Sequence, residues 1–182
     1  MTENIKINTL KSLLPNSPFV VEQVGFALKF AQETGKDLTD VLDQAILLTE
    51  YANKFSNPNF YAYRPIVCAL LSVVDDEDKL TMFATETNSV LTTLAEYKQF
   101  QAEFNSNLKQ ACCSLAKAIM NNSDVVVVCL TYLIKAVEKG EEISLLRSAY
   151  ISVDLRLNGF ELTGAKYEAY NKLLIAIHKA NF

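Results

Sequence analysis

The strongest constraint on the fold is the distribution of glycine and proline. All four prolines lie before residue 66, and no glycine occurs between Gly35 and Gly140. Strands joined by tight turns need glycine, proline or Asn-Gly pairs about every 8–12 residues. A long stretch without such residues is typical of helices. The sequence therefore predicts an all-α fold, a single-domain irregular antiparallel helical bundle of about seven to nine helices covering residues 1–182.

Length and composition set the class of protein. The chain has 182 residues, of which 50% are hydrophobic, so it can bury the core of one domain and is not broadly disordered. Its longest apolar run, residues 125–134, is shorter than the ~18 residues of a membrane span. The N-terminus lacks the basic and then apolar pattern of a secretion signal. We expect a cytoplasmic protein, or one in the host cytoplasm if it is viral, with no membrane span.

Capping residues place the first helices. A helix over residues 5–14 should stop before Pro15, because the residue before proline is disfavoured in the α conformation. Ser17 caps a second helix, with Pro18 at its first position and Gly35 after its end. Asp37 caps a third.

The segment of residues 76–120 has an apolar register that runs from Phe83 to Ala118 in alternating steps of four and three. One unbroken helix over residues 78–120 would be about 60 Å long, against a diameter of roughly 40 Å for a compact chain of this size. Either the helix breaks at residues 105–107 to give a hairpin, or the molecule is elongated or assembled. We favour the break, because the Asn-Ser-Asn sequence prefers turns and caps.

The apolar run of residues 125–134 could form a buried strand or a buried helix. No partner strand is visible and the segment continues to Gly140, so the sequence favours a central helix that is apolar on all sides. A helix over residues 142–157, with Val153 facing inward, and a C-terminal helix capped by Thr163, with Tyr167 facing inward, should follow.

Charge argues against a nucleic-acid partner. The formal net charge is −4, and lysine and arginine form no cluster or stripe. The first 91 residues carry 7 basic and 12 acidic side chains, whereas the other 91 carry 10 and 9. This asymmetry is compatible with head-to-tail contact between copies, although it is small.

Residues suited to catalysis are scarce. The one histidine, His178, has no carboxylate near it in sequence, and the four cysteines show no CxxC spacing. The four carboxylates of residues 75–78 fall within one helical turn, and no second acidic motif faces them, so they are better suited to starting a helix. Glycine-rich phosphate loops are missing. The sequence therefore predicts that the protein is not an enzyme and has no catalytic residue, no metal site and no cofactor.

Residues suited to binding are more evident in the sequence than residues suited to catalysis. Phe60, Tyr61, Tyr63 and Arg64 lie on a connection bounded by prolines, and aromatic and arginine side chains are enriched at interface hot spots. These residues are the candidate binding site. Alternatively, the aromatic side chains simply close one end of the bundle. A second candidate is the C-terminal helix, where Lys166, Lys172 and Lys179 lie beside an apolar stripe.

Three functional hypotheses follow. The first is a non-catalytic protein–protein interaction or assembly protein, acting as an adaptor or regulator, which binds a protein partner or itself. The alternative is a structural or regulatory subunit of a virus or phage particle, which would fit the bias towards lysine and asparagine as a sign of AT-rich coding. The third is a helical enzyme that binds a small ligand or a metal ion through Asp75, Asp76 and Asp78.

Overall fold

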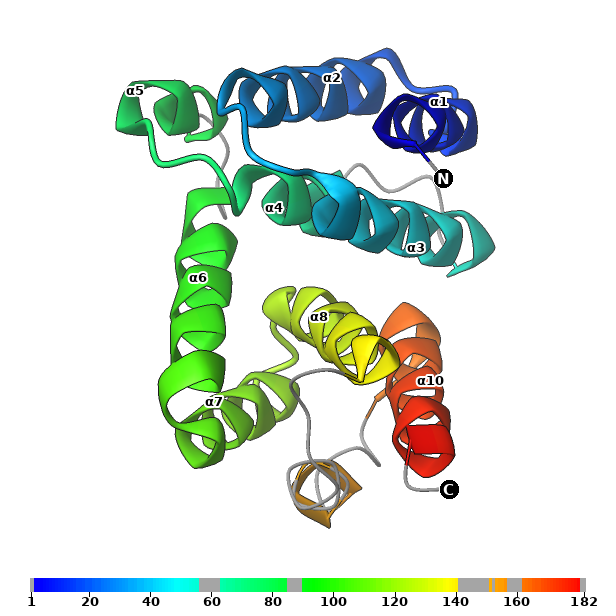
Figure 1. Ribbon diagram of the computed structural model, residues 1–182, viewed down its shortest axis with the longest axis vertical. Coiled ribbons are helices and arrows are strands. Elements are labelled where there is room, and N and C mark those ends of the chain that lie inside the picture. The colour runs from blue at the N-terminus through cyan, green and yellow to red at the C-terminus, as the bar shows by residue number, and fades with distance from the viewer. Residues whose placement is uncertain are drawn as a thin grey trace. The chain divides into compact units, whose positions relative to one another are not determined.

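The fold is all-α, as predicted. A computed structural model describes residues 2–55, 63–84, 90–140, 151, 153–156 and 162–180, and every regular element within them is helical (Figure 1). Contacts divide the chain into two compact units, Met1–Tyr97 (unit 1) and Lys98–Phe182 (unit 2). The prediction that residues 1–182 form one domain is not tested by this division and stays a prediction.

Unit 1 is built from antiparallel helices arranged in two layers. Helix α3 packs against α1 and α4, and α2 packs against α4. In Figure 1, α1 and α2 form one layer and α3 and α4 the other. The bounds are α1 Glu3–Leu13, α2 Pro18–Glu33, α3 Thr39–Phe55, α4 Tyr63–Leu71, α5 Glu77–Leu80 and the 3₁₀ turn η2 Thr81–Phe83.

The predicted caps of unit 1 are confirmed. The Ser17 hydroxyl accepts a hydrogen bond from the Val20 N–H, and α2 ends before Gly35, which has a φ of 71°. Glycine is suited to this left-handed position because it has no Cβ. The Asp37 carboxylate accepts from the Thr39 N–H at 2.9 Å and so supports the first turn of α3.

Two polar contacts join α3 to other parts of unit 1. Lys6 of α1, which is buried, forms an ion pair with Asp43 of α3 at 2.7 Å. The Tyr97 hydroxyl donates to the Gln44 side-chain oxygen at 3.0 Å, and both side chains are buried. Each contact pairs a polar group that would be costly to bury alone.

The segment of residues 76–120 contains more breaks than predicted. The helix expected from residue 78 ends at Leu80 and tightens into η2, so residues 78–120 do not form one unbroken helix. The 3₁₀ turn places Phe83 edge-on to Phe30 of α2, with ring centroids 6.2 Å apart, and buries it there. The break predicted at residues 105–107 is confirmed, because α6 (Val90–Ser106) ends there and the Asn107 side chain caps α7 (Leu108–Met120).

Unit 2 centres on α8 (Val125–Lys139), which packs against α7 and α10 (Gly164–Ala180). Ten of the fifteen α8 residues are buried, so the run of residues 125–134 is the buried helix that we expected and not a strand. The helix ends at Gly140, whose φ of 68° again lies in the left-handed region that suits glycine.

Two side chains predicted to face inward are exposed. Val153 is 65% exposed, whereas Ile151 and Leu155, each two residues away and therefore on the opposite helix face, are fully buried. Tyr167 is 50% exposed. Which face of a helix points inward depends on the elements that pack against it. Without those elements, the sequence cannot show which of two adjacent sets of apolar positions is buried. Most of the helix predicted over residues 142–157 lies outside the described residues.

Within the described ranges, none of the helices combines the length and the apolar character that crossing a bilayer would require.

Candidate functional site

The predicted aromatic and arginine segment is only partly described. Phe60 and Tyr61 lie outside the described residues, whereas Tyr63 and Arg64 form the first turn of α4 and are 1% and 3% exposed. The Tyr63 ring meets Phe19 of α2 edge-on, with centroids 5.2 Å apart. This contact favours the structural alternative, in which aromatic side chains close one end of the bundle. A binding role for these residues stays a prediction.

Two carboxylates of the acidic run, residues 75–78, already form contacts within unit 1. The Asp76 carboxylate accepts from the Asp78 N–H at 3.0 Å and the Lys79 N–H at 3.4 Å, which makes it the N-cap of α5. The Asp75 carboxylate pairs with Lys36 at 3.2 Å, and Lys36 also donates to the Val73 carbonyl at 3.0 Å. In the part of the chain that the structure describes, no group of three acidic, thiol or imidazole side chains is placed to hold a metal ion.

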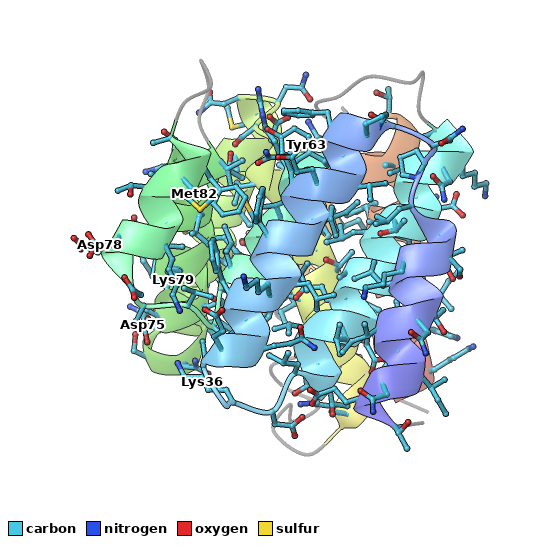
Figure 2. The ribbon with its side chains drawn as sticks, turned by 90° about the horizontal axis from the view of Figure 1, so that it is seen from above. Lys36, Tyr63, Asp75, Asp78, Lys79 and Met82 are labelled. Carbon is cyan, nitrogen blue, oxygen red and sulfur yellow. The ribbon has the colours of Figure 1, made fainter. Side chains whose placement is uncertain are left out.

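An ion pair joins α5 to the end of α2. Lys79 donates to the Glu33 carboxylate, and this hydrogen bond lowers the pKa of Glu33 and raises the pKa of Lys79. The Lys79 ammonium also lies 5.7 Å from the centroid of the Phe30 ring. Figure 2 shows Lys79 on the side facing α2 and Asp78 pointing away from the unit. These contacts hold α5 against the end of α2, and they leave the outer side of α2 uncovered.

The outer face of α2 is the least expected feature of unit 1. This face, defined by Pro18, Val21, Glu22, Gly25, Lys29 and Gln32, is exposed along its whole length. Val21 is 48% exposed. In Figure 2, α2 lies nearest the viewer, and no other described helix crosses over it.

Gly25 stands in the middle of this face, and no contact among the described residues gives it a structural reason. Its backbone is helical, and a Cβ built on it would meet no heavy atom within 4 Å. Glycine in an exposed helix interior costs about 1 kcal/mol relative to alanine. Neither a turn nor close packing among the described residues offsets that cost. Our sequence reasoning missed this residue, although an isolated glycine within a helical pattern could have indicated it.

The buried thiol of Cys112 is poorly suited to act as a nucleophile. Burial is the main cause that raises the pKa of the Cys112 thiol to about 12, and the negative charge of Asp154 adds to it. The thiol is therefore neutral at physiological pH, and a neutral thiol is a poor nucleophile. His178 is exposed in the last turn of α10.

Helix α10 carries the second predicted binding candidate. Lys172 and Lys179 are exposed, and so is Ile175, at 55%. Lys166 instead faces the end of α7, where it donates to the Asn122 carbonyl at 3.2 Å and to its side-chain oxygen at 2.8 Å. Burial lowers the pKa of Lys166, while the charge of Asp124 opposes that shift. The three lysines therefore do not form one surface.

Searches of protein-family models, of curated proteins and of solved structures with this chain find no match.

Proposed function

We propose that this protein is a non-catalytic interaction or assembly protein that binds a protein partner through exposed helix surfaces, and that the outer face of α2 is the main binding surface. The observation that supports this proposal is the combination of half-exposed Val21 with Gly25, a glycine that no contact among the described residues requires. A partner that packs closely against the backbone would account for both.

The energetics of such a surface are favourable. Burying the exposed part of a valine side chain contributes on the order of 1 kcal/mol. A glycine allows a partner backbone to approach more closely than any other residue would. The neighbouring charged residues, Glu22 and Lys29, would lie at the edge of the contact, where polar groups can stay hydrated.

Hydroxyl-radical footprinting, read by mass spectrometry, tests the proposal. The protein is footprinted in dilute buffer and in extract of its source cells, and oxidation of Val21 is compared with that of Ile175, which is similarly exposed on α10. We expect oxidation of Val21 to fall several-fold more than that of Ile175 in the extract. Equal changes at the two residues would contradict the assignment of the surface to α2.

The alternative of a virus or phage subunit uses the same kind of surface but predicts open-ended assembly. Electron microscopy of the purified protein over a range of concentrations would show filaments, rings or shells in that case. The metal-dependent alternative is tested by calorimetric titration with Mg²⁺, Mn²⁺ and Ca²⁺. We expect no saturable heat, because Asp76 already caps α5 and Asp75 already pairs with Lys36. Saturable binding that an Asp75→Asn variant loses would favour the enzyme.

A further inference from the structure

We propose that the partner of the α2 face is a second copy of this chain, and that two α2 helices cross antiparallel at Gly25 about a two-fold axis. This inference rests on the proposed function, since it names the occupant of the same surface. It goes further in predicting a closed dimer of the purified protein, without any other component.

The residues on the α2 face form a narrow seam. At 100° per residue, the central positions of the face lie within about 40° of Gly25 around the helix axis. These positions are Pro18, Val21, Gly25, Lys29 and Gln32, all of them exposed. Only Lys29, at the margin of the seam, is charged, so a second helix that covers the seam must offer it a carboxylate.

Charge is arranged symmetrically on one side of this seam. Glu22 and Lys29 lie about 60° and 40° from Gly25, in the same direction around the axis. They are also equidistant from the point between Gly25 and Phe26, about 5 Å along the helix on either side, given a rise of 1.5 Å per residue.

A two-fold axis through that point would place Glu22 opposite Lys29 of the second copy, and Lys29 opposite Glu22. The surface is therefore complementary to itself in the antiparallel orientation. In a parallel pair, each charged residue and its equivalent would instead lie on opposite sides of the seam, so neither Glu22 nor Lys29 would meet an opposite charge of the second copy. The charges thus favour one orientation over the other.

Gly25 would lie at the crossing point itself. Helices usually pack with their axes about 8–10 Å apart, and a residue without a side chain at the contact favours the lower end of that range. Close approach of a second backbone would explain why a glycine stands in this exposed helix interior. It also lets Val21 of each copy reach the neighbouring helix.

The predicted dimer is weak and reversible. At 1.5 Å per residue the sixteen residues of α2 span about 24 Å, so one helix pair buries an area at the low end for stable protein interfaces. We expect a dissociation constant on the order of micromolar.

Sedimentation equilibrium of the full chain, from about 1 µM to 1 mM, tests this proposal. The wild type should fit a monomer–dimer equilibrium. Reversing one charge, by Glu22→Lys or Lys29→Glu, should weaken self-association about tenfold or more, because each change places like charges together at two equivalent sites. The double variant, which carries both changes, should recover the wild-type affinity.

Mixing gives a sharper test. The Glu22→Lys chain has two positive charges beside the seam and the Lys29→Glu chain has two negative charges, so the mixture should form a heterodimer tighter than either homodimer. Lys109→Glu, a charge reversal at an exposed position of α7, is the matched control and should dimerise like the wild type.

Gly25→Ala separates the interface from the fold. A Cβ at this position meets no described atom within 4 Å, so alanine should raise the melting temperature of the dilute monomer by about 2–4 °C. It should nevertheless weaken the dimer. Parallel loss of stability and association would point to a structural role only and would overturn the proposal.

A wild type that stays monomeric up to 1 mM, or charge variants that associate like the wild type, would also overturn it. If the purified protein is monomeric while the Val21 footprint is lost in the extract, the dimer is wrong and the proposed function survives. If the footprint in the extract is unchanged as well, both fail.

Discussion

The turn after α7 offers a sharp test of the structure, because one residue there has an unusual backbone. Asn122 has a φ of 51°, in the left-handed region that favours glycine. The Ser123 N–H donates to the Ala118 carbonyl at 3.0 Å and the Asn122 N–H to the Ile119 carbonyl at 3.1 Å. This hydrogen-bond pattern is a Schellman motif, with Asn122 at its left-handed position. Replacing it with alanine should therefore strain the backbone.

The magnitude follows from two contributions. An ordinary L-residue in the left-handed region costs about 1–2 kcal/mol, and asparagine tolerates the region better than alanine. Alanine also loses the 2.8 Å hydrogen bond from Lys166 to the Asn122 side chain, although the bond to the carbonyl can remain. Since this side is partly exposed, we assign that loss about 0.5–1 kcal/mol. We expect Asn122→Ala to lower the free energy of unfolding by about 1–2 kcal/mol.

Asn122→Gly separates the two contributions, because glycine relieves the backbone but also loses the hydrogen bond. It should lie within about 0.5 kcal/mol of the wild type. Asn121→Ala is the matched control: Asn121 is also exposed, but its φ of −87° suits any residue, so no measurable change is expected. Urea unfolding followed by circular dichroism measures all three variants. If Asn122→Ala equals the wild type, or if glycine destabilises as much as alanine, the reasoning is refuted.

Four further predictions concern buried groups. The pKa of Cys112 is raised from 9.0 to about 12, so the folded state loses stability as pH rises through this interval, by about 1.4 kcal/mol at pH 10. Cys112→Ala should remove this loss, and unfolding measurements at pH 8 and pH 10 test it. At pH 8, iodoacetamide labelling resolved by mass spectrometry should modify the partly exposed Cys113 much faster than Cys112; equal rates would contradict the burial. Tyr97→Phe removes the hydrogen bond to buried Gln44 and should cost about 1–2 kcal/mol in urea unfolding, whereas an unchanged midpoint would show that the bond contributes nothing. At a fully buried position of α8, Leu130→Ala should cost about 2–5 kcal/mol in the same assay, and a cost below 1 kcal/mol would place this side chain near the surface.

Most helix positions were predictable because they depend on local physics. Ser17, Gly35 and Gly140 act through hydrogen bonds and backbone conformations that involve only their near neighbours in sequence. The break at Asn107 is of the same kind, since this side chain caps the helix that follows it. For these residues the sequence carries the whole signal.

The candidate site was much less predictable. Tyr63 and Arg64 were candidates either for binding or for closing one end of the bundle, and both are buried at the start of α4. Aromatic and arginine side chains suit a core and an interface equally well, so residue type alone cannot separate the two. Gly25 was not singled out, because its importance appears only once its surroundings are known to be empty.

The sequence by itself determined that this chain is helical, and where most of its helices begin and end, because caps, breakers and apolar spacing act over a few residues. The tertiary structure alone decided which apolar side chains are covered. Val153 and Ile151 are both apolar and near neighbours on one helix, yet only Ile151 is buried. Burial depends on which elements pack on a helix face, and those contacts join residues far apart along the chain.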